Sequence, residues 1–318
     1  MKYKNRFLLS LVCMVFYAVL SAQPAFQVVP LGVKGGMAEN NLSAYMLAPA
    51  GDNRFICLDA GTVHAGLEKA VAKKTFRQPV SVVLKTYLKA YFISHGHLDH
   101  LAGMVINSPE DSVKNIYAMP YVLKVLRDKY FSWQSWANFA DSGEAPLLKK
   151  YHYKTLDTIA EVPVENTDLF VKTFILSHGT GYNSTAFLVR HQEAFALYLG
   201  DTGADTIEHS SRLLQLWQAI APLVKAKQLK GIFIETSFPN QQPDNQLFGH
   251  LTPKLLMHEM GVLHQLCGGG NILQDLPLIV THIKPAGNNE ADIKKQLKQN
   301  NPFKMKLVFP KQGKRILL

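Results

Sequence analysis

The sequence is poor in cysteine, with only 3 in 318 residues: Cys13, Cys57 and Cys267. None has a Cys-x-x-Cys partner, which argues against a thiolate metal site of the zinc-ribbon kind. Cys13 falls in an apolar N-terminal segment, and Cys57 lies inside the apolar run 54–59. An exported protein could pair Cys57 with Cys267, but the position of Cys57 favours a buried free thiol.

Dense positive charge is also missing. The formal net charge is +10, yet the chain has no block of five or six basic residues and no interleaved pattern of basic and aromatic residues, so we expect no nucleic-acid partner. The mild basic bias would help to attract an anionic substrate by long-range steering, but scattered Lys and Arg residues are usually just a solvated surface. Repeats, low-complexity tracts and long linkers are absent as well, and 47% hydrophobic content is ordinary for a globular protein. These features predict one domain over residues 23–318.

Residues 1–22 have a composition of their own. Lys2, Lys4 and Arg6 occur without an acidic residue, residues 7–20 are almost wholly apolar, and Ser21-Ala22 precedes Gln23. This pattern is typical of a secretory signal peptide and is too short for a comfortable membrane span; an uncleaved anchor is the alternative. We therefore expect an exported protein, periplasmic or secreted, with no membrane span in the mature chain.

The chemistry of the chain is concentrated in one turn. The hexapeptide His95-Gly-His-Leu-Asp-His100 directly follows the apolar run 90–93. Three imidazoles and a carboxylate on a strand-to-helix turn suit zinc, manganese or iron. One turn could serve two ions, with His95 and His97 facing the first ion and Asp99 and His100 facing the second.

Other apolar runs, which read as buried strands, also end at residues able to bind metal or move protons. If these strands belong to sheets that share an edge, their terminal side chains gather there. Any one of them taken alone is more often an isolated polar residue. Their coincidence with the histidine turn favours a metal centre. The residues are His178, Asp201, Glu235 and His282.

Strand-like and helix-like segments alternate along the chain. Two successive halves of strands and helices predict two sheets face to face with helices outside, an α/β sandwich. The segment 110–170 is rich in aromatic residues and carries helical signals. We expect strands at 43–47, 54–58, 185–190, 194–199 and 305–309, and helices at 100–106, 120–131, 207–229, 253–266 and 289–299.

The segment His95–Pro109, HGHLDHLAGMVINSP, resembles the signature of class II cyclic-nucleotide phosphodiesterases, a branch of the metallo-β-lactamase superfamily. The resemblance implies a four-layer αββα sandwich, two divalent metal ions, and hydrolysis of cyclic AMP or cyclic GMP to nucleoside 5′-monophosphates. Shorter segments recur in the family's order: LDAGT at 58–62, SHG at 177–179, LGDT at 199–202, ETS at 235–237 and GHLTP at 249–253.

The resemblance also implies roles for single residues. A hydroxide shared by the two ions would be the nucleophile, with Asp99 steering its proton in addition to binding metal. Zinc is the expected metal, with manganese and iron as alternatives. His95, His97 and His178 would bind the first ion, Asp99, His100 and His282 the second, and Asp201 would bridge both.

Two further segments resemble those of transfer-RNA 3′-processing relatives in the same superfamily. ETSF begins at Glu235, and GHLTP contains His250. The resemblance implies that His250 protonates the departing O3′ and that Glu235 orients its ring. The alternative is that both residues only brace the surroundings of the second metal.

The metal ligands do not by themselves select the substrate. Another hydrolase on the same centre, such as a nuclease or an esterase, is one alternative, since one fold hosts many chemistries. A protein that binds nucleotides without turning them over is another. The long signature favours the phosphodiesterase, and none of the seven predicted ligands is missing.

Overall fold

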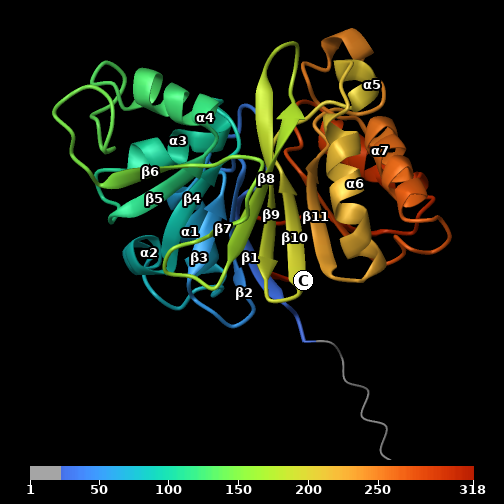
Figure 1. The fold of residues 1–318 in the computed structure, drawn as a ribbon, viewed down its shortest axis with the longest axis horizontal. Coiled ribbons are helices and arrows are strands. Elements are labelled where there is room, and N and C mark those ends of the chain that lie inside the picture. The colour runs from blue at the N-terminus through green and yellow to red at the C-terminus, as the bar shows by residue number, and fades with distance from the viewer. Residues whose placement is uncertain (1–22) are drawn as a thin grey trace, which may run out of the picture.

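Two seven-stranded sheets packed face to face form the centre of the molecule (Figure 1). The computed structural model describes residues 23–318, and the predicted signal peptide at 1–22 lies outside them. The first sheet has the order β14-β1-β2-β3-β4-β5-β6 and the second β13-β12-β11-β10-β9-β8-β7. The strands of the first are β1 (Phe26–Gly32), β2 (Ala44–Pro49), β3 (Phe55–Leu58), β4 (Leu88–Ile93), β5 (Lys114–Ala118), β6 (Tyr151–Thr155) and β14 (Ile316–Leu317).

The second sheet is built from the C-terminal half of the chain. Its strands β7 to β13 follow one another across the sheet in sequence order. The members are β7 (Val162–Pro163), β8 (Phe170–Ser177), β9 (Asn183–His191), β10 (Ala194–Leu199), β11 (Leu229–Glu235), β12 (Pro277–Thr281) and β13 (Lys306–Val308).

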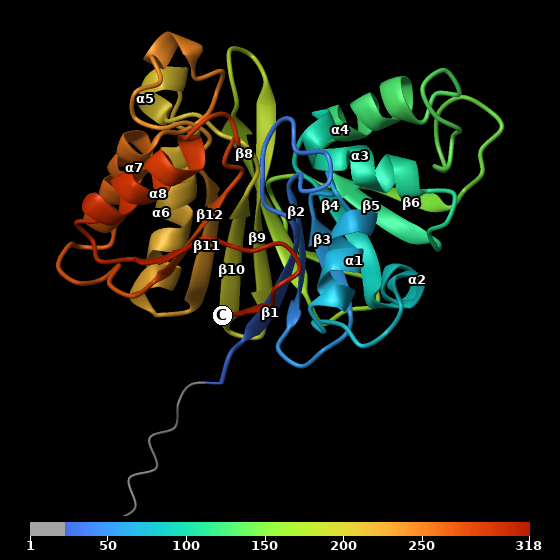
Figure 2. The same cartoon turned by 180° about the vertical axis from the view of Figure 1, so that it is seen from behind.

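Helices cover the outer faces of both sheets. Figure 1 shows α1 to α4 outside the first sheet, and Figure 2 shows α8 beside α6 and α7 outside the second. The predicted αββα sandwich is therefore confirmed. The helices are α1 (His64–Ala72), α2 (Val80–Val82), α3 (Leu98–Asn107), α4 (Pro120–Val125), α5 (Asp205–Glu208), α6 (Arg212–Lys225), α7 (Pro253–Leu266) and α8 (Asn289–Gln299).

Aromatic side chains join the two sheets. The ring of Tyr45 on β2 lies 5.8 Å from Tyr198 on β10 and 5.6 Å from Phe233 on β11, centroid to centroid. Phe92 on β4 contacts Phe187 on β9 edge-on at 5.5 Å. All five rings are buried, so they stabilise the sandwich through both buried apolar area and favourable ring geometry.

Strand direction brings chemically active residues to one edge. Strands β3 to β6 are parallel, and so are β10 to β13. β8 and β10 are both antiparallel to β9, which makes β8 parallel to β10. The carboxyl ends of β8, β10, β11 and β12 therefore share one edge of the second sheet. The end of β4 in the first sheet lies at the same rim of the sandwich, because His95 after β4 is 3.9 Å from Asp201 after β10. Sites are commonly built at such a rim.

The sequence predicted some elements better than others. The helices expected at 253–266 and 289–299 have the observed bounds. For the first of these, Pro253 occupies the opening turn, and the Thr252 hydroxyl accepts a hydrogen bond from the Leu255 amide. The single helix expected at 207–229 is wrong. A left-handed residue at His209 separates α5 from α6, and β11 already begins at Leu229.

In the segment 110–170, the helix expected at 120–131 is confirmed, but the rest of the segment is less helical than predicted. It contains β5, β6 and β7 besides α4, which continues as a π-helical turn, Leu126–Tyr130. β6 is a partly exposed strand of mixed composition, so it lacks the apolar run that marks a buried strand.

The cysteines and the lengths of the helices bear on two further expectations. Cys57 and Cys267 are both buried and free, as expected for Cys57. Among residues 23–318, no helix has the length and apolar character needed to cross a bilayer.

Candidate metal centre

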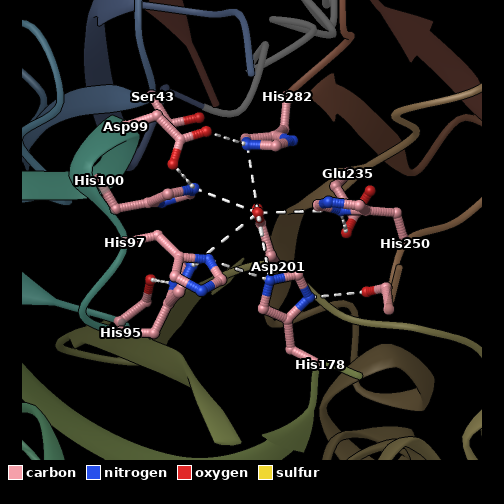
Figure 3. Close-up of polar contacts among 12 residues, drawn as sticks. Ser43, His95, His97, Asp99, His100, His178, Asp201, Glu235, His250 and His282 are labelled. Atoms are coloured by element: carbon pink, nitrogen blue, oxygen red, sulfur yellow. Dashed lines mark hydrogen bonds and ion pairs between the residues drawn. The ribbon is translucent and has the colours of Figure 1, made fainter. Parts of the chain in front are cut away.

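The seven predicted metal ligands lie together at the shared rim, around the carboxylate of Asp201 (Figure 3). They come from both halves of the sandwich. Four belong to the turn after β4 and the first turn of α3, and the other three follow β8, β10 and β12. Five of the seven are buried, while His97 is exposed and Asp99 is partly exposed. The centre is therefore open to solvent on the side of His97 and Asp99.

Three imidazoles form the first set of donors. Nε2 of His95 lies 3.0 Å from Nδ1 of His97, and Nε2 of His178 lies 3.3 Å from that same Nδ1. Nitrogens bound to one tetrahedral zinc, at about 2.0–2.1 Å each, lie about 3.3 Å apart. The spacing of these nitrogens fits a single ion among them.

A second set lies on the other side of Asp201. Nε2 of His282 is 3.1 Å from Oδ2 of Asp99, and Nε2 of His100 is 4.0 Å from Oδ1 of Asp99. Two imidazoles and a carboxylate form a mixed N/O set that suits zinc, manganese or iron. The structure thus brings together the same two trios that the sequence predicted.

Asp201 stands between the two trios. Its Oδ2 lies 3.2 Å from Nε2 of His100 and 3.1 Å from Nε2 of His282. On the other side, Nε2 of His95 and Nε2 of His178 are each 3.9 Å from the same oxygen. A carboxylate in this position can contact both members of a pair of ions.

One buried nitrogen supports the fit to metal. Nε2 of His100 has no hydrogen-bond partner within residues 23–318, although it lies close to Asp201, because the two groups are not aligned for a hydrogen bond. A buried polar atom without a partner is costly, and a bound cation would satisfy its lone pair. The donor set therefore fits divalent metal binding.

Electrostatics in the two trios also favour metal. Burial lowers the pKa of His178 to about 4, and burial likewise holds the pKa of His95 and of His97 below the usual value. Neutral imidazole is the form that binds metal. Although burial favours the neutral ring, the carboxylates of Asp201 and Asp59 raise the pKa of His100, which marks this region as one that attracts positive charge.

Asp59 holds the ligands of the histidine turn in place. Its buried carboxylate accepts hydrogen bonds from Nδ1 of His100 at 2.7 Å, from the Tyr198 hydroxyl at 2.7 Å, and from the Ser94 amide and hydroxyl at 2.7 and 2.8 Å. The Ser94 hydroxyl in turn lies 2.9 Å from Nδ1 of His95. Both imidazoles can then donate from Nδ1, which leaves Nε2 free to face an ion.

Backbone and hydroxyl groups orient two further ligands. Nδ1 of His178 is 2.8 Å from the carbonyl oxygen of Gly249, and Nδ1 of His282 is 2.9 Å from the hydroxyl of Ser237. His282 itself has a positive φ of 53°, and a Cβ on Gly35 would lie 2.2 Å from its ring. Only glycine at position 35 allows the loop to pack this closely on His282.

Glu235 and His250 form a buried pair at the same rim. Oε1 of Glu235 lies 2.8 Å from Nδ1 of His250, and the His250 ring is 4.8 Å from the His178 ring and 5.2 Å from the His282 ring. Burial opposes charge on both groups. Their mutual attraction nevertheless lowers the pKa of Glu235 and raises that of His250.

The oxygens of Glu235 are already engaged. Oε1 accepts from His250 and from the Thr202 amide at 2.9 Å, while Oε2 accepts from the Ser237 hydroxyl at 2.5 Å and from the Leu251 amide at 3.3 Å. Four hydrogen bonds occupy the four lone-pair positions of a carboxylate. Glu235 is therefore placed to orient His250 and not to bind an ion, although its carboxylate lies near that of Asp201.

Sequence reasoning missed the residues that support the ligands: Asp59, Ser94 and Ser237. Two of them lie in segments that already carried the family resemblance, LDAGT and ETS, so the signal was present. Ser94, directly before His95, had no pattern of its own. What links these side chains to the centre is their hydrogen-bond geometry, which requires the fold.

The chain is similar to known proteins over nearly all its described length. Residues 25–308 match the family model described as class-II cAMP phosphodiesterases. A 3′,5′-cyclic-nucleotide phosphodiesterase of Aliivibrio fischeri is 40% identical, covering 98% of both chains. A probable 3′,5′-cyclic-nucleotide phosphodiesterase of Yersinia pestis is 37% identical, covering 91% of this chain and 88% of the relative.

Solved structures share the architecture. Unliganded yeast PDE1 has a TM-score of 0.82 at 24% identity, with 93% of this chain and 100% of that chain covered. The metallo-β-lactamase fold protein YhfI of Bacillus subtilis has a TM-score of 0.59 at 15% identity, with 93% and 100% covered. At these identities the likeness concerns the fold, and it identifies the αββα sandwich as that of the metallo-β-lactamases.

Proposed function

The chain belongs to the class-II cAMP phosphodiesterase family, and on that premise we propose that it hydrolyses 3′,5′-cyclic nucleotides to nucleoside 5′-monophosphates at a centre for two divalent metal ions. The observation that carries the proposal is the pair of donor trios on either side of Asp201. When bound there, divalent ions lower the pKa of water and offset the negative charge of the phosphodiester.

The roles of the metal-facing residues follow from their positions. His95, His97 and His178 would hold one ion, and Asp99, His100 and His282 would hold the other, with Asp201 placed between the two sets. Asp99 is partly exposed, and its Oδ2 also accepts a hydrogen bond from the Gly36 amide at 2.9 Å. This position lets it steer the proton of the attacking water, although its main role would be to bind metal.

His250 completes the chemistry of the leaving group. Hydrolysis breaks the bond between phosphorus and O3′, and the departing oxygen needs a proton. With Nδ1–H directed at Glu235, the protonated ring carries its second proton on Nε2 and can donate it to O3′. Glu235 acts as a positioning residue, since it stabilises the protonated ring and fixes its direction.

A substrate panel tests the function. Metal-loaded protein is assayed with cyclic AMP, cyclic GMP, single-stranded RNA and a β-lactam, with products identified by chromatography. We expect 5′-AMP and 5′-GMP to be the products and the other two compounds to be poor substrates. His97→Ala should abolish this turnover, and the matched variant His64→Ala should keep it. His64 is exposed, and its one ion pair within residues 23–318 is with Glu68, at 3.7 Å.

Each alternative has its own outcome in the same panel. Preferential cleavage of RNA or the β-lactam would identify another hydrolase on the same fold. Turnover of cyclic nucleotides no faster than in buffer would point to a binding protein. The donor chemistry makes zinc the proposed metal, with manganese and iron as alternatives. Metal analysis of the purified protein, followed by reconstitution with each ion, decides among them.

The proposed location is outside the cytoplasm. Its support is the composition of residues 1–22, in which a basic start precedes an apolar stretch. A protein there would act on external nucleotides. Activity found in the periplasm or medium, and lost from both when residues 1–22 are deleted, would agree with export. Activity retained in the cytosol by the full-length chain would contradict it.

A further inference from the structure

Beside the metal centre lies a cavity of about 900 Å³ that the chemistry above does not use. Its lining comes from the turn between β8 and β9, from the end of α5 through the first residue of α6, and from residues between Asp244 and Gly249, just before His250. The turn and α5 lie at the same end of the molecule in Figure 1. The volume falls in the range of pockets that bind small molecules.

The cavity shares a wall with the first donor trio. The ring of Tyr182, part of the lining, stacks on His97 at 4.8 Å with an interplanar angle of 6°. Gly249, also in the lining, accepts the hydrogen bond from Nδ1 of His178. A Cβ on Gly249 would lie 2.2 Å from the Gly179 amide nitrogen, so glycine is required for this contact. A molecule whose phosphate lies at the metal centre can therefore extend into this cavity.

Phe248 is the unusual residue of the lining. Its side chain is 70% exposed, and its backbone has a φ of 53°, in the left-handed region that bulky residues avoid. An aromatic ring held in a strained conformation while contributing little to the core is typical of a functional position. Tyr182 is exposed too. Among residues 23–318, only one other aromatic residue, Trp133, is exposed to this degree, and it lies outside the cavity.

Hydrogen-bond donors and acceptors complete the lining of the cavity. The exposed side-chain amides of Asn183 and Asn245 each offer a donor and an acceptor. Glu208 and Asp244 add acceptors, and Arg212 adds donors. Flat aromatic surfaces together with mixed donors and acceptors suit a neutral heteroaromatic base, whose faces stack and whose edge carries donors and acceptors.

We infer that this cavity binds the nucleoside end of the cyclic nucleotide, with the base stacked on Phe248. The inference rests on the proposed function and deepens it, because it identifies which residues recognise the part of the substrate that does not react. Stacking tolerates different bases, so the cavity would accept both cyclic AMP and cyclic GMP.

The test compares substrates with and without a base. Wild-type protein and Phe248→Ala are assayed with cyclic AMP and with methyl β-D-ribofuranoside 3′,5′-cyclic phosphate, which lacks a base. We expect Phe248→Ala to lower kcat/KM for cyclic AMP roughly tenfold, mainly through KM, and to leave the base-free substrate unchanged. Calorimetric titration with 5′-AMP should show a similar loss of affinity.

Two matched variants complete the design. Phe248→Trp keeps a stacking surface and should restore the affinity for 5′-AMP. Trp133→Ala removes another exposed aromatic residue with a positive φ, of 61°, and should change neither substrate. Equal losses on both substrates, or no loss on cyclic AMP, would overturn the inference while the proposed function stands. Failure of the wild type to cleave either substrate would overturn both.

Discussion

Asp59 accepts a hydrogen bond from Nδ1 of His100 at 2.7 Å, although 41 residues separate them in the chain. Asp59 follows β3 with a positive φ of 54°, and His100 lies in the first turn of α3. Neighbouring parallel strands β3 and β4 place the two segments side by side. The contact sets the direction in which His100 presents its unpaired Nε2 to the centre.

Replacing Asp59 should therefore weaken metal binding without touching a predicted ligand. Asp59→Asn removes the charge and leaves one oxygen to serve four hydrogen bonds. We expect about a 10- to 100-fold loss of metal affinity or activity, the usual effect of removing a partner of a ligand. Calorimetric titration of the metal-free protein with metal ions measures the metal affinity.

The control for this prediction is Tyr198→Phe, which removes only one hydrogen bond to the same carboxylate. Its metal affinity should stay close to that of the wild type. If Asp59→Asn binds both ions as tightly as the wild type while its fold is intact by circular dichroism, the carboxylate has no role in orienting His100.

His250→Ala should separate protonation of the leaving group from other roles. A cyclic nucleotide has a poor leaving group, so losing the proton donor should lower its turnover by about 10²- to 10⁴-fold. An aryl phosphodiester such as bis(4-nitrophenyl) phosphate releases a stable phenolate and should lose much less. Steady-state rates on the two substrates give the comparison, and equal losses would instead indicate that His250 braces the second metal.

Removal of metal should lower stability as well as activity. The centre joins segments from both halves of the sandwich, so ions bound to the folded state stabilise it by mass action, by about 2.7 kcal/mol at a free metal concentration 100 times Kd. Dialysis against a chelator should lower Tm, and adding metal back should restore it. An unchanged Tm in protein proven free of metal would contradict a centre that links the two halves.

Glu259 supplies a pH-dependent prediction away from the centre. Its carboxylate accepts hydrogen bonds from Nε1 of Trp217 at 3.0 Å and from the Asp205 amide at 3.2 Å, and burial raises its pKa. The folded state therefore holds this proton to a higher pH than the unfolded state, so its contribution to stability is lost as the pH rises from the ordinary value through the raised one.

Glu259→Gln removes that titration. The free energy of unfolding of the wild type should fall relative to the variant across this pH window and remain parallel to it outside the window. Urea unfolding of both proteins at a series of pH values, in the presence of constant metal, gives the difference. A difference that does not change with pH would contradict a raised pKa at Glu259.

The sequence predicted the ligands because each one follows an apolar strand or lies in the histidine turn. The alternation of elements predicted two sheets with helices outside, and the family resemblance implied the four-layer αββα order. The residues that orient the metal ligands by hydrogen bonds were harder to predict. Asp59, Ser94 and Ser237 act through hydrogen bonds between segments far apart in sequence, and those depend on strand order. The break between α5 and α6 was missed because His209, a residue with no strong helix-breaking tendency, adopts the left-handed conformation. Strand β6 was missed because its sequence, YHYKT, has no apolar run.

Diffraction from metal-loaded crystals at the absorption edge of the bound metal would show directly whether two ions bind at this centre. We expect two anomalous peaks on either side of Asp201. One should be coordinated by His95, His97 and His178, the other by Asp99, His100 and His282. A single peak, or two peaks surrounded by other residues, would contradict a two-ion centre built around Asp201.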